Sequence, residues 1–371
     1  MSKTLQDYAT LINDTIQSNE INHYITTDNM CQNLGGIDTL KNINIPQGKV
    51  RSFQKDDVLL SNIRLYFRKV YRAKQKGGCS SDVLVFRAKH IDSATLFAIL
   101  SSQIFTDYAC SGSQGSKMPR GNKTHMMDFK IPTINFTIAK IFNSIQNKIE
   151  NNHKINELLH KILELLYEQY FVRFDFLDEN NKPYQTSGGK MKFSKELNRL
   201  IPNDFEVKTL GELTQLKVGN KNANHSSNQG KYPFFTCSNN PLRCETYQFE
   251  GKHIIISGNG NFYVTHYDGK FDAYQRTYVV NPNNPNHYVL IYLFVKSYTN
   301  YLKLQSRGSI IKFITKSDIE NIKIVLPNLK TYAKWNNVLK MIENNNQATQ
   351  TLTALRDFLL PLLLTQQVKP Q

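Results

Sequence analysis

Basic and aromatic side chains alternate in one short segment of the sequence, residues 64–76. The segment holds six basic residues and no acidic one, interleaved with Tyr66, Phe67 and Tyr71. Lysine and arginine neutralise phosphate groups, and arginine can also donate two hydrogen bonds to a guanine edge. A solvated basic loop is the alternative, but the pattern favours contact with DNA. The residues expected to contact DNA here are Ser61, Arg64, Arg68, Lys69, Arg72, Lys74 and Lys76.

Two glycine-containing loops form a second candidate phosphate-binding pattern. Residues 112–123 read GSQGSKMPRGNK, and residues 306–312 read SRGSIIK. Tight glycine turns expose backbone N–H groups that can approach a phosphate closely. An ordinary connection between strands is the alternative. The expected DNA contacts from these loops are Ser116, Lys117, Arg120, Lys123, Arg307, Ser309 and Lys312.

Motifs for catalysis and for cofactor binding are missing from the sequence. Residues 257–260, SGNG, are not followed by the Gly-Lys-Ser/Thr of a nucleotide-binding loop. The stretches 240–242 and 281–283 begin like an adenine methyltransferase motif but lack its second proline and its aromatic residue. No Asp plus Glu-x-Lys nuclease triplet stands out. We therefore expect no catalytic residue and no bound cofactor.

The cysteines and histidines do not indicate a metal site. The five cysteines, Cys31, Cys79, Cys110, Cys237 and Cys244, fall at no recurring ligand spacing. The nine histidines form no His-x-Glu or His-Glu-x-x-His motif. Free thiols in a reducing compartment are expected, with no metal ion.

The overall charge also favours a polyanionic partner. The chain has 371 residues, with 46 Lys and Arg against 30 Asp and Glu, a net charge of +16. A folded protein this basic points to nucleic acid or an anionic membrane surface. The apolar run 358–364 is far shorter than the ~20 residues of a membrane span. Residues 1–7 lack the apolar core of a signal peptide, so we expect a cytoplasmic protein without a membrane partner.

The elements that position these residues occur twice, because the sequence contains an internal repeat. Gly115 aligns with Gly308, and the triplet ENN at 150–152 aligns with 343–345, each 193 residues later. Upstream the offset changes to 196 and then to 205, as expected where loops differ in length. The two halves are therefore expected to be copies of one unit.

Each half ends in a long helix with a coiled-coil pattern. In the first half, apolar residues occupy heptad positions a and d over four heptads, and two asparagines interrupt them. A buried asparagine layer fixes register at a cost in stability. The expected seam residues of this helix are Ile138, Phe142, Ile145, Ile149, Asn152, Asn156, Leu159, Leu163 and Leu166.

The second helix has a less regular seam. Arg356 falls at the strict d position, and Pro361 should end or kink the helix. Two seamed helices of matching length are expected to pack antiparallel, each about 50 Å long at 1.5 Å per residue. The expected seam residues of the second helix are Trp335, Val338, Ile342, Asn345, Leu352, Leu355 and Leu359.

The remaining segments predict two small α/β domains. Buried strands are expected at 58–60, 83–86, 254–256 and 278–280, followed by helices at 94–105 and 288–302. The predicted fold class is therefore α/β (α+β), with two small domains joined by two long antiparallel coiled-coil helices in a pseudo-twofold repeat. The expected divisions are a first domain at 1–135, a helix with its linker at 136–205, a second domain at 206–330 and a second helix at 331–371.

Several of these segments resemble a known family. Residues 142–158 and 170–176 resemble the central conserved region of type I restriction-modification specificity subunits, and 352–363 resemble their distal conserved region. Residues 53–64 and 209–213 are similar to the target-recognition domains of that family. The likeness covers nearly the whole chain.

The resemblance implies a DNA-specificity subunit without chemistry of its own. Its two target-recognition domains would each bind one half of a split DNA sequence, held apart by the two helices. Two modification subunits, which methylate adenine N6 with S-adenosylmethionine, and restriction subunits, which translocate and cut double-stranded DNA, would be its partners. Base-reading residues cannot be transferred, because these domains vary with the sequence that they read.

Two other functions remain open on the sequence. One is a stand-alone DNA methyltransferase or nuclease with an unrecognised site. The other is a non-catalytic coiled-coil adaptor whose charge is incidental. Neutralising residues 64–76 separates the adaptor from a DNA reader, because only the reader would lose affinity and show a shallower salt dependence.

Overall fold

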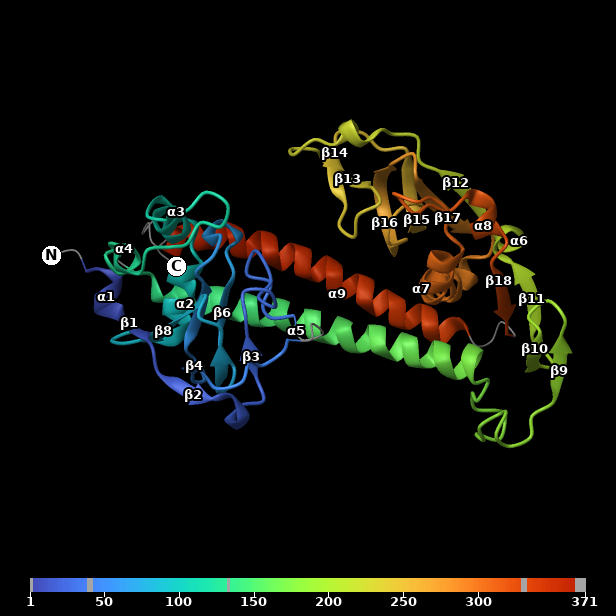
Figure 1. Cartoon of the computed structure of the whole chain (residues 1–371), viewed down its shortest axis with the longest axis horizontal. Coiled ribbons are helices and arrows are strands. Elements are labelled where there is room, and N and C mark those ends of the chain that lie inside the picture. Colours follow the sequence, from blue (N-terminus) through green and yellow to red (C-terminus); the bar gives the residue numbers. More distant parts are fainter. Residues whose placement is uncertain (1–2, 39–42, 132–133, 328–331, 364–371) are drawn as a thin grey trace. The chain divides into compact units, whose positions relative to one another are not determined.

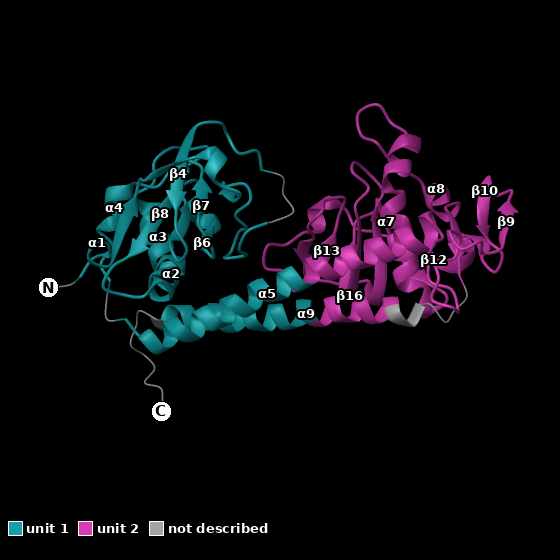
Figure 2. Ribbon diagram, turned by 90° about the horizontal axis from the view of Figure 1, so that it is seen from below, with its two compact units in different colours: residues 1–155, 345–371 teal, residues 156–344 magenta. Residues whose placement is uncertain are grey.

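The chain folds into two compact units. The computed structural model describes residues 3–38, 43–131, 134–327 and 332–363. Unit 1 comprises residues 1–155 and 345–371, and unit 2 comprises residues 156–344 (Figure 2). Within the described residues, no helix is both long and apolar enough to cross a membrane.

Unit 1 contains two four-stranded sheets. The first has the order β1-β8-β5-β6, all antiparallel, and the second has the order β2-β4-β7-β3, with β3 parallel to β7. Figure 1 labels most of these strands. Val58, Leu60 and Phe86 are buried in the first sheet, as expected from their apolar runs. The strands are β1 (Ala9–Ile12), β2 (Thr15–Gln17), β3 (Tyr24–Ile25), β4 (Lys49–Phe53), β5 (Val58–Ser61), β6 (Val70–Arg72), β7 (Gly77–Cys79) and β8 (Val83–Ala88).

Two consecutive helices cover the first sheet of unit 1. The sequence predicts one helix at 94–105, but the structure has α2 (Ser93–Ser101) and α3 (Gln103–Ser111). Ser102 separates them because its hydroxyl oxygen accepts the N–H of Phe105 at 3.1 Å and starts a new helix. Two shorter helices, α1 (Leu5–Tyr8) and α4 (Lys123–Met127), complete this side. Their apolar faces join one core with Phe97, Phe105 and Met126.

Unit 2 is built on a six-stranded sheet of order β12-β17-β15-β16-β13-β14. Its strands are β12 (Thr214–Val218), β13 (Tyr232–Phe235), β14 (Leu242–Cys244), β15 (Phe249–Ser257), β16 (Val264–Ala273) and β17 (Thr277–Pro282). Two small sheets pair β9 (Met191–Ser194) with β10 (Arg199–Pro202), and β11 (Glu206–Thr209) with β18 (Lys323–Leu326). Besides parts of the two long helices, unit 2 contains α6 (Leu210–Leu213), α7 (Tyr288–Gln305) and α8 (Lys316–Glu320). The apolar first half of α7 is buried, as its sequence predicts.

The same pairings recur in the two units at the offsets seen in the sequence. The order β1-β8-β5-β6 in unit 1 corresponds to β12-β17-β15-β16 in unit 2. Thr4 bridges Lys130, and Thr209 pairs with Lys323 in the same way. Both threonines begin a short helix with a capping box. The two units therefore share one fold, as the repeat predicts.

Two long helices carry the expected seams. α5 spans Phe136–Tyr167 and continues as a short π-helix, Glu168–Val172. α9 spans Tyr332–Leu359 and is followed by the 3₁₀ turn Leu360–Leu363, which contains Pro361. Each helix contributes residues to both units. The expected division at 330/331 lies outside the described residues.

The two helices run antiparallel where they meet within unit 1. Nδ2 of Asn152 donates to Oγ1 of Thr349 at 3.1 Å, and Nη1 of Arg356 donates to Oε1 of Gln146 at 3.2 Å. Residues later in α5 therefore contact residues earlier in α9, as in an antiparallel pair. Within unit 2, Nδ2 of Asn156 donates to the carbonyl of Ile342 at 3.4 Å. The interrupting asparagines are therefore hydrogen-bonded across the seam.

Burial follows the predicted seam closely on α5 and less closely on α9. The buried members are Ile138, Phe142, Ile145, Ile149, Asn152, Asn156, Leu159, Leu163, Trp335 and Ile342, whereas Leu166, Val338, Asn345, Leu352 and Leu359 are partly exposed. Leu355 is a wrong assignment, since its side chain is 44% exposed. Arg356 occupies the inward position, with 2% of its surface exposed, because Gln146 offers it an acceptor.

Candidate nucleic-acid interface

The first glycine-containing loop is a hairpin that contacts the start of the basic segment. Gln114 and Arg120 exchange backbone hydrogen bonds of 2.9 and 2.8 Å, and Gly115 makes the turn possible with a φ of +99°. The N–H of Arg64 donates to the carbonyl of Pro119 at 2.9 Å. The structure thereby brings together two groups of residues that lie far apart in the sequence.

The tip of this hairpin is exposed and basic. Ser116, Lys117 and Lys123 are all exposed, and Lys123 begins α4. Arg120 is 62% exposed on its side chain and forms an ion pair with Asp82 at 2.9 Å. Exposed ammonium groups beside a tight glycine turn are suited to phosphate contacts.

Much of the 64–76 segment is committed to contacts inside unit 1. Nη2 of Arg68 donates to the carbonyl of Ser101 at 2.9 Å, and Nζ of Lys69 donates to the carbonyl of Thr27 at 2.5 Å. Burial lowers the pKa of Arg68 below its ordinary value. These two cations are therefore occupied with backbone carbonyls rather than extended towards solvent.

Three further members of the predicted DNA-contact set differ in accessibility. Ser61 is 2% exposed, and its hydroxyl donates to the carbonyl of Ile63. The prediction that Ser61 contacts DNA is therefore wrong, because the side chain is buried. Nε of Arg72 lies 3.7 Å from Oδ1 of Asp56. Lys76 is exposed and remains available to a partner.

Lys74 connects the first domain to the long helix rather than reaching away from it. Its Nζ lies 2.7 Å from Oδ1 of Asn147 and 3.4 Å from Oε2 of Glu150, both on α5. Tyr66, in contrast, is 52% exposed and its ring lies 4.7 Å from that of Phe67, edge to face. An exposed aromatic beside cations offers a surface on which a base or sugar can pack.

Unit 2 presents a hairpin of the same construction. Arg307 and Phe313 exchange backbone hydrogen bonds of 3.0 and 2.8 Å, and Gly308 has the same φ of +99° as Gly115. The N–H of Gly260 donates to the carbonyl of Lys312 at 2.8 Å. The two hairpins occupy equivalent places, 193 residues apart in sequence.

The side chains on the second hairpin differ from those on the first. Ser309 and Lys312 are exposed, and Nη2 of Arg307 lies 3.2 Å from Oδ1 of Asp318. Ile310 is 95% exposed and Ile311 is 61% exposed. The pattern of basic residues does not indicate these two isoleucines, although two β-branched apolar residues closely following a glycine are visible in the sequence. Exposed apolar side chains on a loop tip indicate a contact surface.

The geometry favours binding rather than catalysis. The two hairpin tips and Arg64 offer ammonium, guanidinium, hydroxyl and backbone N–H groups, which are donors to phosphate oxygens and base edges. The guanidinium of Arg64 lies 5.9 Å from the ring of Phe67, and its Nη2 contacts the carbonyl of Lys117 at 3.4 Å. These contacts hold the arginine beside the first tip.

A family model matches the second half of the chain. Residues 202–355 match the model of the type I restriction modification DNA specificity domain. The chain therefore contains a type I restriction modification DNA specificity domain over these residues. The matched segment contains most of unit 2, including the second hairpin.

Individual relatives of this family match different lengths of the chain. The EcoDI specificity subunit of Escherichia coli is 38% identical over 132 residues, which are 34% of this chain and 28% of that protein. The MjaIX specificity subunit of Methanocaldococcus jannaschii is 24% identical over 301 residues, 72% of this chain and 67% of that protein. The chain thus aligns with about a quarter of the first relative and two thirds of the second.

A solved structure shares the fold. The crystal structure of a type I restriction-modification S subunit from M. genitalium covers 98% of this chain, and this chain covers 96% of that one. Its TM-score is 0.61 at 16% sequence identity. The likeness extends over both units, as the repeat predicts.

Proposed function

We propose that this chain is the DNA-specificity subunit of a type I restriction-modification complex. Each unit binds one half of a split double-stranded DNA sequence, and the hairpins at 114–120 and 307–313 contact that DNA. The chain itself is not an enzyme and holds no cofactor. Two modification subunits supply adenine-N6 methylation with S-adenosylmethionine, and restriction subunits supply translocation and cleavage, in the cytoplasm.

The observation that carries this proposal is the recurrence of one hairpin on two units of the same fold. Both hairpins have a glycine turn with a φ of +99°, and both are tied to the residues just after a matching strand, β5 in unit 1 and β15 in unit 2. Their tip residues differ, with Lys117 and Met118 in one and Ile310 and Ile311 in the other. One scaffold with different tips is what two readers of two unlike half-sites require.

The net charge supports the same function. A charge of +16 attracts a polyanion at long range, and the exposed lysines of the first tip supply short-range contacts. We also propose that the domain divisions expected from the sequence, at 135, 205 and 330, are the limits of the two DNA-binding domains and of the helices that connect them.

Methylome sequencing of cells with and without this gene tests the proposal. The expected result is an N6-methyladenine motif of two short blocks separated by a spacer, present with the gene and absent after its deletion. Purified chain should also bind a duplex that carries the motif more tightly than one with either block scrambled. A chain that binds neither duplex, and whose deletion changes no motif, would overturn the proposal and favour the adaptor.

A further inference from the structure

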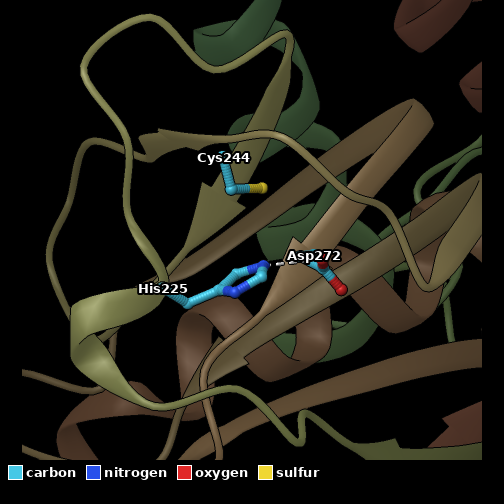
Figure 3. Close-up of side chains that lie close together, drawn as sticks. All are labelled: His225, Cys244 and Asp272. Carbon is cyan, nitrogen blue, oxygen red and sulfur yellow. Dashed lines mark hydrogen bonds and ion pairs between the residues drawn. The ribbon is translucent and has the colours of Figure 1, made fainter.

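Three side chains of the kinds that bind metals meet in unit 2. His225 ends the 3₁₀ turn Ala223–His225, Cys244 ends β14, and Asp272 lies in β16 (Figure 3). The ligand atoms of the three side chains all lie within 4.8 Å of one another. Nε2 of His225 lies 3.1 Å from Oδ2 of Asp272.

The polar groups around Asp272 leave one carboxylate oxygen without a partner. Asp272 is 0% exposed, and its Oδ2 accepts a hydrogen bond of 2.6 Å from Oγ1 of Thr246. Its Oδ1 is buried and has no hydrogen-bond partner within the described part of the chain. A buried carboxylate costs free energy unless a cation or donors compensate it. The buried carboxylate of Asp272 is therefore only partly compensated by the donors around it, and a cation bound beside it would supply the rest.

The thiol of Cys244 is equally enclosed. Cys244 is 0% exposed, and its Sγ lies 3.2 Å from the carbonyl of Thr246 and 3.6 Å from that of Tyr232. Without a cation, burial and the nearby carboxylate of Asp272 raise the pKa of this thiol. A bound metal would reverse that effect, because it stabilises the thiolate.

We propose that His225, Cys244 and Asp272 bind one zinc ion. Imidazole nitrogen, thiolate sulfur and carboxylate oxygen form the donor set that zinc accepts, whereas magnesium and calcium prefer oxygen alone. Oδ2 of Asp272, which lies 3.1 Å from Nε2 of His225, is the carboxylate ligand, and the hydrogen bond from Thr246 to the same oxygen orients the group. Zinc is usually four-coordinate, which leaves one position for water. When zinc binds, the thiol of Cys244 releases its proton to solvent and its sulfur binds the metal as a thiolate.

The proposed ion joins the connection between β12 and β13 and the edge strand β14 to β16, which is paired on both sides. His225 lies in the connection between β12 and β13, and β14 is a three-residue edge strand paired only through β13 within the described residues. Zinc would tie both segments to β16 and so order the outer edge of the sheet. The inference departs from the expectation of no metal and does not depend on the proposed DNA function.

Cobalt substitution tests the site directly. The full chain, freed of affinity tag and stripped with a chelator, is titrated with Co²⁺ under reducing conditions. We expect one equivalent to bind, with a thiolate charge-transfer band in the near ultraviolet and visible bands of tetrahedral intensity, both removed by Zn²⁺. Cys244→Ser should abolish the near-ultraviolet band, whereas Cys237→Ser, which changes a thiol outside the cluster, should keep it. A band that survives in Cys244→Ser, or its absence from the unmodified chain, would overturn the proposal.

A measurement without variants guards against misfolding of the serine variant. X-ray absorption at the zinc edge on the zinc-loaded, unmodified chain should show one sulfur and about three nitrogen or oxygen neighbours, the distribution expected of a tetrahedral site.

Zinc should also raise the unfolding temperature of the unmodified chain, and His225→Gln should reduce that increase. Coordination without sulfur, or zinc binding with no increase in unfolding temperature, would contradict the site.

Discussion

Nη1 of Arg356 on α9 donates a hydrogen bond of 3.2 Å to Oε1 of Gln146 on α5, and the two side chains are 2% and 1% exposed. Gln146 also donates through Nε2 to the carbonyl of Leu34 at 2.7 Å. Arg356 completes its contacts with Oδ1 of Asp357 at 3.0 Å. A polar pair thus connects the two long helices at a position where the heptad pattern calls for an apolar residue.

Removing one member of this pair should destabilise unit 1. Arg356→Leu leaves Oε1 of Gln146 buried without a partner, at a cost of about 1–3 kcal/mol in the free energy of unfolding. The double variant Gln146→Leu/Arg356→Leu should cost less than the sum of the two single variants, since it leaves neither side chain unpaired. Urea unfolding of the four proteins measures this coupling.

Leu355→Ala provides the control for that cycle. Leu355 precedes the buried arginine but is exposed, so its truncation should change the unfolding free energy by no more than about 0.5 kcal/mol. Single-variant effects that add up fully in the double variant would show that the pair is not coupled.

The sequence predicted the seam of α5 much better than that of α9. Ile138, Phe142 and Leu163 are buried because a heptad pattern depends on residues of one helix only. On α9 the inward position belongs to Arg356, whose acceptor lies 210 residues away in the chain. No local pattern reveals such a partner, and an apolar pattern alone favours the neighbouring Leu355.

The candidate sites show the same limit. The density of basic residues identified the 64–76 segment but could not separate Lys76, which is exposed, from Lys69, which is hydrogen-bonded to a backbone carbonyl. That difference depends on a distant part of the chain, because the acceptor of Lys69 is the carbonyl of Thr27, 42 residues earlier. His225, Cys244 and Asp272 come from separate elements that only the sheet brings together, so their spacing carries no motif.

The stability of unit 2 should fall in mild acid because of His266. Burial, followed by the charges of His160, Lys252 and Lys296, lowers the pKa of His266 from 6.5 to about 4. Above pH 6.5 the imidazole is neutral in both states. Between pH 6.5 and about 4 the unfolded chain takes up a proton that the folded chain does not, so up to about 3 kcal/mol of stability is lost. Below that range both states are protonated and this loss ends.

His266→Gln should remove this part of the acid sensitivity. Urea unfolding at pH 7 and pH 4.5 should give a smaller difference for the variant than for the unmodified chain, by about 2–3 kcal/mol. His153→Gln changes an exposed histidine of α5 and serves as the control. If the pH profiles of His266→Gln and the unmodified chain run parallel, His266 is not the source of the effect.

The first hairpin should contribute measurably to the salt dependence of DNA binding. Lys117 and Lys123 are exposed beside the Gly115 turn. Each phosphate that a lysine neutralises adds about 0.9 to the steepness of log K against log salt. The double variant Lys117→Gln/Lys123→Gln should therefore weaken binding and reduce the slope by up to about 2. Titration of a labelled duplex at several salt concentrations measures both quantities.

Lys55→Gln is the matched control, because Lys55 is exposed just before β5 whereas the hairpin is tied to the residues just after it. It should leave the slope unchanged. Equal slopes for the double variant and the control would place the first hairpin outside the DNA interface.

The second hairpin should contribute through apolar contact rather than charge. Ile310 and Ile311 are 95% and 61% exposed, so replacing both by serine should change the unfolding free energy by less than about 0.5 kcal/mol. If DNA covers them, the same change should weaken specific binding by about tenfold while the salt slope stays constant, since no charge is removed. Leu200→Ser removes an exposed leucine of β10 as the control. A double-serine variant that binds the specific duplex as tightly as this control would show that DNA does not cover the isoleucines. Their exposure would then point to another partner, because packing within the fold does not bury them.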